Sequence, residues 1–296
     1  MKTLHNLILH TNIPHQPSNA QKMRSEIIEH MFVTFLLQLR PQYPKLFTEV
    51  KAKQILNRIF GKNNGNISVQ AEESIDNIIQ LLYERYPDIQ YFHNHPLQED
   101  RGVQYPRIQY RCHRRKLVIV VLQEAIPIVE TWLSKADWNS WITYKNIVHK
   151  KESFDLIKIL EKPLYYRLMD WVAMNSDNYQ EWQHKILLKD RLPILERALT
   201  GQMRRVASSF IEDSTWENIT AELVTINQTK SVQGYHHKDI AFNVICRSNI
   251  QLPPCLAIGK SISIGYGTLS LTRWQGEVSR HSIENNTEQL VYEPIL

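Results

Sequence analysis

The sequence has little of what disulfide-bonded, zinc-binding or membrane-spanning proteins need. It contains three cysteines, an odd number, and no Cys-x-x-Cys pair. Neither a disulfide framework nor a zinc site is therefore indicated, and a reducing, cytoplasmic setting fits best. No run approaches the ~18 uncharged apolar residues that a membrane helix needs, so we expect neither a membrane anchor nor a signal peptide.

The chain also lacks the sequence motifs of several common enzyme classes. No Gly-x-Ser-x-Gly elbow is present, so a serine hydrolase of that kind is unsupported. In the one glycine-rich stretch Lys260 follows the first glycine instead of the last, which excludes a Walker loop, and a clean dinucleotide fingerprint is missing too. Carboxylates and cysteines show no metal-ligand spacing, and we expect no metal and no cofactor.

Size and charge leave room for two domains and a polyanionic partner. A chain of 296 residues with 43% hydrophobic residues can bury one large core or two smaller cores of about 150 residues each. Lysine and arginine total 35 against 30 acidic residues, which gives a formal net charge of +5. This balance favours a partner such as nucleic acid, although charge alone does not identify one.

Three of the nine glycines fall within residues 256–271, in an otherwise apolar and β-branched run. This spacing predicts a turn of close backbone approach, followed by a strand that begins at Thr268. Such a turn can hold an RNA phosphate with its backbone N–H groups and nearby polar side chains, or it can simply let a final strand pack. The candidates for phosphate contact are Gly259, Lys260, Ser261, Ser263, Gly265 and Gly267.

Hydrophobic periodicity in the first half predicts the order strand, helix, strand, strand, helix, strand. The first helix begins at Ser18 or Asn19 and buries Ile27, Ile28, Met31, Phe35 and Leu36. A helical hairpin at 46–60 and 71–86 interrupts this order, and an exposed loop or a short irregular strand follows at 91–101. The six predicted elements are a strand at 4–9, that first helix, strands at 103–111 and 117–123, a helix at 125–134 and a strand at 141–148. This order is the split βαβ of a ferredoxin-like domain.

The second half repeats this pattern less regularly. Its predicted elements are a strand at 154–160, helices at 165–182 and 188–199, with Gly201 ending the latter, and strands at 219–223, 240–246 and 268–272. The predicted fold class is α+β, with two tandem ferredoxin-like (RRM-like) domains. The first domain covers 1–150 with a helical insertion at about 41–88, and the second covers 151–296 with the glycine-rich loop and a C-terminal tail.

A basic segment at 101–123 contains no acidic residue. Its cations are Arg101, Arg107, Arg111, Arg114, Arg115 and Lys116. Since Arg107 and Arg111 alternate with apolar residues along a predicted strand, near the rings of Tyr105 and His113, they favour contacts to single-stranded RNA. An ordinary solvated hairpin has the same composition. A second basic set, Arg197, Arg204 and Arg205, is a weaker candidate for RNA binding.

His93 and His95 form the most chemically suggestive pair in the chain. On an extended segment both imidazoles point to one side, where one can take the 2′-hydroxyl proton of RNA while a second group protonates the leaving 5′-oxygen. A metal site would need a third ligand such as Asp100. Plain surface polarity is the other interpretation.

Four separated blocks resemble the CRISPR repeat-RNA endoribonucleases, the sixth numbered Cas protein of the RAMP superfamily. The blocks are Phe92-His93-Asn94-His95, Tyr105-Pro106-Arg107-Ile108-Gln109-Tyr110, Trp171-Val172-Ala173-Met174-Asn175 with Asn178-Tyr179, and Leu252-Pro253 with the run Ile258 to Gly267. The resemblance covers most of the chain. It departs from the family pattern in its long helical insertion, in the lack of a lysine just after the histidines, and in the tail after Thr272.

The resemblance implies metal-independent cleavage of precursor CRISPR RNA within each repeat, leaving 2′,3′-cyclic phosphate and 5′-hydroxyl ends. It implies that a histidine between the first helix and the second strand is catalytic, so that His93 and His95 are candidates with Arg101 or Tyr105 as helpers. The mature guide RNA would pass to an interference complex in antiviral defence. A catalytically silent RAMP subunit that only holds guide RNA is the alternative, and monomer and homodimer both stay open.

Overall fold

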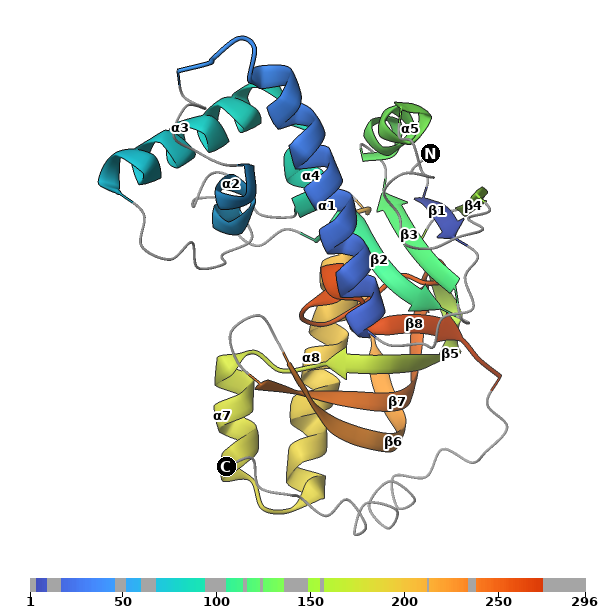
Figure 1. Ribbon diagram of the computed structural model, residues 1–296. Coiled ribbons are helices and arrows are strands. Elements are labelled where there is room, and N and C mark those ends of the chain that lie inside the picture. Colours follow the sequence, from blue (N-terminus) through green and yellow to red (C-terminus); the bar gives the residue numbers. More distant parts are fainter. Residues whose placement is uncertain are drawn as a thin grey trace.

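The computed structural model describes residues 4–9, 17–45, 52–59, 68–93, 105–113, 116–122, 125–135, 149–154, 157–211, 213–233 and 238–273. Two four-stranded sheets organise these residues, one from each half of the chain. Figure 1 shows the first sheet and its helices in the upper part of the molecule and the second sheet below them. None of the helices in the described ranges combines the length and the apolar composition of a membrane span.

The first sheet contains β1 (Leu4–Leu9), β2 (Ile108–His113), β3 (Lys116–Leu122) and β4 (His149–Phe154). Its strand order is β2-β3-β1-β4, with every neighbouring pair antiparallel. Helix α1 (Pro17–Leu39) follows β1, and α5 (Ala125–Lys135) follows β3. This is the predicted ferredoxin-like arrangement. The predicted strand at 141–148 lies outside the described residues, and β4, which extends past residue 150, is the fourth strand.

The helical insertion lies between α1 and β2, as predicted. It consists of α2 (Ala52–Ile59), α3 (Val69–Arg85) and the short α4 (Ile89–His93), and Figure 1 shows α2 and α3 projecting to one side. Ser68 caps α3 by accepting a hydrogen bond from the Ala71 N–H at 3.2 Å. The prediction of an exposed loop from residue 91 was wrong at its start, because Phe92 is buried against the helices.

The second sheet contains β5 (Lys158–Val172), β6 (Ala221–Gln233), β7 (Lys238–Gln251) and β8 (Thr268–Leu271). Its order, β6-β7-β5-β8, matches that of the first sheet position by position. Helices α7 (Ser176–His184) and α8 (Leu188–Ser208) follow β5, and the 3-10 turn η1 (Ser214–Asn218) precedes β6. In the first domain, helix α5 connects β3 to β4. In the second domain, the equivalent connection from β7 to β8 is the glycine-rich segment, which contains the 3-10 turn η2 (Ile262–Ile264).

The predicted helix at 165–182 was wrong up to residue 172, because residues 158–172 form the long central strand β5, and it was correct over 176–182, which belong to α7. Tyr166 and Leu168 face the core while Arg167 between them is exposed, which is the two-residue period of a strand. At Asp170 a bulge with a positive φ of 53° interrupts this period and brings Trp171 and Val172 into buried positions. The bulge therefore made the apolar spacing look helical.

Other boundaries also differ from the predictions. Gly201 does not end α8, because the apolar stripe continues through Met203 and Val206 to Ser208. The predicted strand at 154–160 comprises the end of β4 and the start of β5 instead, and β6 begins at Ala221. The tail from residue 274 lies outside the described residues.

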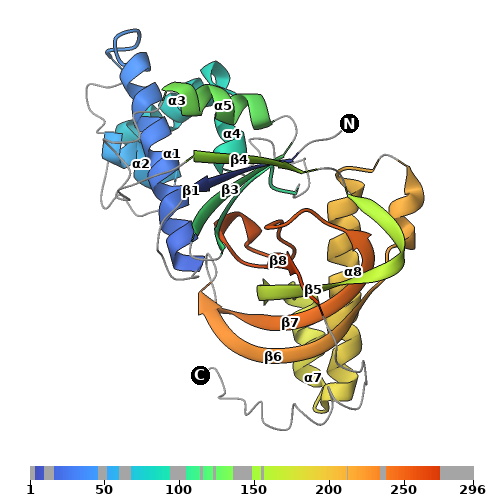
Figure 2. The same cartoon turned by 90° about the vertical axis from the view of Figure 1, so that its right-hand side faces the viewer.

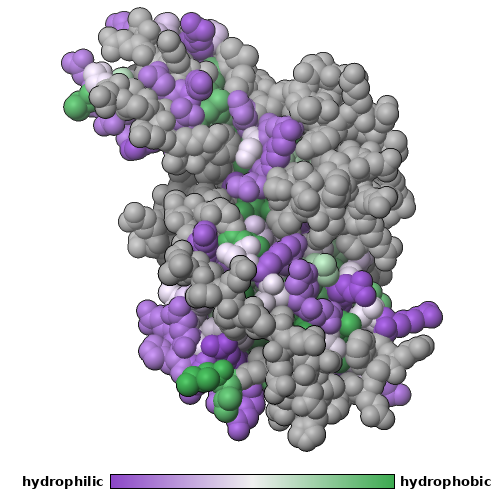
Figure 3. All heavy atoms as spheres, turned by 60° about the horizontal axis from the view of Figure 1, so that its bottom comes forward, coloured by the Kyte–Doolittle hydropathy of each residue, from purple (hydrophilic) through white to green (hydrophobic). Residues whose placement is uncertain are grey.

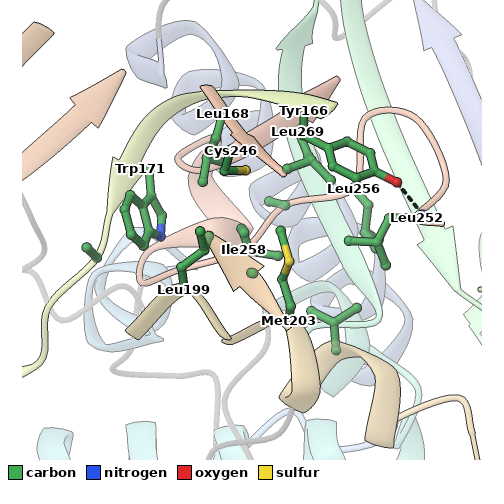
Figure 4. Close-up of a cluster of buried hydrophobic side chains, with 14 of the residues drawn as sticks. Tyr166, Leu168, Trp171, Leu199, Met203, Cys246, Leu252, Leu256, Ile258 and Leu269 are labelled. Carbon is green, nitrogen blue, oxygen red and sulfur yellow. Dashed lines mark hydrogen bonds between the residues drawn. The ribbon is translucent and has the colours of Figure 1, made fainter. Parts of the chain in front are cut away.

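Both faces of the first sheet are covered, by different partners. Ile108, Tyr110 and Cys112 of β2 point toward the helices of the first domain. On the other face, Val118 and Val120 of β3 join the core of the second domain. Figure 2 shows the two sheets with the glycine-rich segment between them, and Figure 4 shows that core, in which Tyr166 and Leu168 of β5 gather with Met203 of α8 and Leu256.

Candidate RNA interface

The glycine-rich loop, residues 256–267, has the left-handed backbone that its glycines predict. Gly259, Gly265 and Gly267 have φ values of 111°, 101° and 67°. A Cβ on Gly267 would lie 1.9 Å from the Ile258 carbonyl oxygen, and one on Gly259 would lie 2.8 Å from the Val172 carbonyl oxygen. Both positions therefore require glycine, because the loop presses against its own backbone and against β5.

Much of the loop's backbone is hydrogen-bonded within the protein. The Lys260 N–H donates to the Val172 carbonyl at 2.9 Å, and the Gly267 N–H donates to the Asp170 carbonyl at 3.0 Å. Ile258 N–H donates to the Gly267 carbonyl at 3.0 Å, which closes the loop on itself. These N–H groups are occupied, so the packing interpretation of the glycines accounts for much of the loop.

The predicted phosphate-binding residues of the loop divide into two groups by burial. Ser263, Gly265 and Gly267 are buried, whereas Gly259, Lys260 and Ser261 are half-buried at its edge. The Lys260 ammonium lies 3.1 Å from a carboxylate oxygen of Asp239 on β7, which compensates its charge. Any phosphate contact by this loop would therefore involve the edge at 259–261.

Arg111 joins the two domains instead of facing solvent. Its guanidinium is fully buried and donates to the carbonyls of Ile262 and Tyr266 at 3.2 and 3.4 Å. It also donates to the side-chain oxygen of Gln109, which is itself buried and donates to the Pro106 carbonyl at 3.1 Å. Burial lowers the pKa of Arg111 to about 10.

This position corrects the prediction that Arg111 binds RNA. The predicted alternation with apolar residues was correct for Arg111, because its neighbours Tyr110 and Cys112 pack on the helices and Arg111 points to the opposite face of the strand. That face, however, lies against the glycine-rich loop of the second domain, and a fully buried guanidinium has no surface for RNA. Arg111 instead holds the turn η2 against the first sheet.

Tyr105 was predicted as a catalytic helper, and its burial argues against that role. Its hydroxyl donates to the Ala257 carbonyl at 2.7 Å, and its ring packs edge-on against Phe210 at 6.3 Å between centroids. Burial raises the pKa of Tyr105 to about 12. The residue is a second bond between the domains, and its proton is not available near neutral pH.

The remaining basic candidates lie in different surroundings. The Arg107 guanidinium is half-buried, 5.9 Å from the centre of the Phe210 ring. Arg204 donates to the Ile219 carbonyl at 3.0 Å, whereas Arg205 next to it is exposed. Arg114 and Arg115 lie outside the described residues, and Lys116 begins β3 with a side chain that is not described.

Of the two candidate catalytic histidines, the structure describes only the backbone of His93. His93 is the last residue of α4, beside the buried Phe92, and its imidazole is not described. His95 and Arg101 lie outside the described residues, so their separation from the loop stays a prediction. Within the described ranges, no group of three or more His, Cys, Asp or Glu side chains could hold a metal ion.

The structure also shows a polar cluster at the bulge in β5 that sequence reasoning missed. The Asp170 carboxylate is 3% exposed and lies 2.5 Å from the Lys230 ammonium on β6. The Asp170 N–H donates to the Asn243 side-chain oxygen at 2.8 Å. No spacing along the chain brings residues 170, 230 and 243 together, and only the strand pairing does so.

The described surface is mainly polar on the face shown in Figure 3, where hydrophobic atoms form small patches. Among the side chains whose burial is described, the exposed large apolar ones are Tyr43, Val69, Ile186, Leu187 and Leu271. They come from separate parts of the chain, except for the adjacent Ile186 and Leu187. Single apolar residues on a surface are ordinary.

Comparison with known proteins identifies both halves of the chain. The family model of the Cas6b N-terminal domain matches residues 66–157, and that of the Cas6b C-terminal domain matches residues 158–272. A search of curated proteins finds no match.

Two solved structures share the overall fold. A crystal structure of Cas6b aligns with a TM-score of 0.59 and 18% identity over 92% of this chain and 100% of that one. A crystal structure of the CRISPR RNA processing endoribonuclease Cas6b aligns with a TM-score of 0.52 and 17% identity over the same shares of the two chains.

Proposed function

The chain belongs to the Cas6b family, and from this premise we propose that it is an endoribonuclease that cleaves precursor CRISPR RNA within its repeats. The observation that carries the proposal is the match of both Cas6b domain models, in order, over residues 66–272. The strand order shared by the two sheets and the likeness to a Cas6b processing endoribonuclease support it. The products would be guide RNAs that pass to an interference complex.

The proposed chemistry is an internal transesterification. The ribose 2′-oxygen attacks the adjacent phosphorus, its proton goes to a general base, and the phosphorus–5′-oxygen bond breaks as a general acid protonates the leaving oxygen. The products are a 2′,3′-cyclic phosphate and a 5′-hydroxyl, and neither water nor a metal ion enters the balance. His93 and His95 are the proposed acid and base, because a neutral imidazole and its protonated form coexist near neutral pH.

The negative charge that builds up on the phosphorus centre during the attack would be stabilised by a cation other than the buried Arg111. Arg101 is the proposed helper, since Tyr105 and Arg111 are engaged between the domains. The edge of the glycine-rich loop at 259–261 and the exposed Arg205 are proposed RNA contacts. Each would act on a phosphate and would therefore position the strand without reading its sequence.

One observation favours a second candidate, the catalytically silent RNA-binding subunit. The burial of Tyr105 removes one of the two helper residues that were predicted beside the histidines. Separate His93→Ala and His95→Ala variants distinguish the candidates. An enzyme loses cleavage of repeat RNA but keeps binding it, whereas a silent subunit binds repeat RNA and leaves it intact both as wild type and as either variant.

Chelation distinguishes the proposed enzyme from a metal-dependent nuclease that uses the same histidines. In EDTA the proposed enzyme retains full cleavage, and its products carry cyclic phosphate ends that resist ligation until they are opened. A nuclease that needs a metal loses activity in EDTA and recovers it when a divalent cation is added.

A further inference from the structure

The two sheets differ in what covers the face that does not pack against helices. The first sheet packs helices on one face and the second domain on the other. The second sheet packs α8 and the 252–258 segment on the face of Tyr166, Leu168 and Val244. Because side chains alternate along a strand, the residues between these point to the opposite face.

That opposite face, which we call the open face, is lined by polar side chains over much of its area. On β5 it carries Tyr165, Arg167 and Met169, and the other strands contribute Glu222, Gln228, Lys230, Asn243 and Arg247. The buried Ile245 of β7 is the register partner of Arg167 on this face. Near Val172 and Ala241 it is closed by Ile264 and Tyr266 of the glycine-rich loop. The part around Arg167 and Arg247 lies away from this closure.

The acidic groups of the open face are already paired. Glu222 lies 2.6 Å from the Arg247 guanidinium across the β6–β7 pair, and Asp170 lies 2.5 Å from Lys230. Arg167 is exposed, and among the described residues no carboxylate forms an ion pair with it. In the part of the chain that the structure describes, the Arg167 guanidinium on this central strand is therefore not in an ion pair.

The neighbours of Arg167 suit a nucleic-acid strand. Tyr165 lies two residues away on the same face of β5, and it is paired in register with Arg247 on β7. Ser270 of β8 is the register partner of Arg167 on its other side. Single-stranded RNA binds to sheets that carry such groups. Its bases stack on aromatic rings and guanidinium planes, and its phosphates pair with arginine.

We propose that the open face around Tyr165, Arg167 and Arg247 binds a single-stranded segment of the RNA substrate. This inference rests on the proposed function and adds to it a binding surface and the strandedness of the RNA. A regular duplex is less suited to the surface, because duplex RNA is held by its shape through phosphates of both strands. Among the described side chains named on the open face, Arg167 is the cation that is not in an ion pair.

Binding of two fluorescent probes tests the inference. One probe is the single-stranded repeat RNA of the source organism, and the other is the same strand annealed to its complement. Arg167→Glu is expected to weaken binding of the single strand at least tenfold and to lower the salt dependence of log K by about 0.7, the value for one phosphate contact on a single strand. Binding of the duplex is expected to change less than threefold.

The matched control is Lys189→Glu. Lys189 is an exposed cation on α8, which covers the other face of the same sheet, so its reversal changes the net charge equally. We expect less than a twofold effect on either probe. Equal losses for the two variants, or equal losses on both probes for Arg167→Glu, would overturn the inference. If Arg167→Glu lowers the thermal midpoint of unfolding, Arg167→Gln replaces it in the test. Its expected loss of single-strand affinity lies between those of wild type and Arg167→Glu.

Wild-type cleavage measured in parallel separates this inference from the proposed function. If wild type cleaves repeat RNA and Arg167→Glu binds the single strand like wild type, the open face is excluded and the endoribonuclease stands. If wild type never cleaves but its binding of the single strand depends on Arg167, the surface is supported and the enzyme is refuted. A wild-type protein that binds neither probe refutes both.

Discussion

Alanine at Gly267 and at Gly201 should change stability in opposite directions. A Cβ at Gly267 would lie 1.9 Å from a backbone oxygen, and alanine is unfavourable by about 1–2 kcal/mol at its φ of 67°. To relieve the clash, the loop must lengthen its bonds to Ile258 and Asp170, at about 1 kcal/mol each. We therefore expect Gly267→Ala to lower the free energy of unfolding by about 3–4 kcal/mol in total.

Gly201 provides the control because the same methyl group meets nothing within 4 Å there. It lies inside α8, where alanine is preferred to glycine by about 1 kcal/mol, so Gly201→Ala should raise stability by about that amount. Urea unfolding followed by tryptophan fluorescence measures both variants. A Gly267→Ala protein within 1 kcal/mol of wild type would refute the close-packed loop.

Three further perturbations test the domain junction and the proposed chemistry. Tyr105→Phe removes the hydroxyl bound to Ala257 and should cost about 1–2 kcal/mol at pH 7, measured by urea unfolding. Because burial raises the Tyr105 pKa from 10 to about 12, its contribution is complete below pH 10 and is lost as pH rises through 12. Tyr105→Phe should therefore lose less stability than wild type over that window, and an identical loss in both would contradict the assignment. Arg111→Met should cost about 2–4 kcal/mol, since two loop carbonyls and Gln109 lose their donor, and an unchanged urea midpoint would exclude Arg111 as a link between the domains. His93→Ala or His95→Ala should lower the single-turnover cleavage rate by about 10²–10⁴-fold while RNA affinity changes less than threefold, and unchanged rates in both would remove the pair from the mechanism.

Local pattern predicted much of the fold correctly. The ferredoxin-like order of both halves, the helical insertion and the hairpin around residues 114–115 followed from two- and three-to-four-residue periods. The long strand β5 was misread because Asp170 forms a bulge, and a one-residue bulge shifts every later side chain to the other face. The local sequence does not predict the bulge, because the backbone of Asp170 is held by hydrogen bonds to Asn243 and Gly267, which are distant in the sequence.

The candidate site was harder to predict because it depends on what covers each strand. The alternation of Arg111 with apolar residues was visible in the sequence, but the loop that buries its side chain begins more than 140 residues later. A basic strand on an open sheet and a basic strand beneath a second domain share one local pattern. The difference between RNA binding and domain joining therefore lies in tertiary contacts, which a single sequence does not contain.

Cleavage of the cognate repeat is the measurement closest to the proposed function. Purified protein is mixed with repeat RNA of its source organism in EDTA, and the product ends are mapped. We expect one cut within the repeat, a 2′,3′-cyclic phosphate on the upstream fragment, and loss of the cut in the His93→Ala and His95→Ala variants. Repeat RNA that is bound at saturating protein yet stays intact, with or without added divalent cations, would contradict the proposed endoribonuclease.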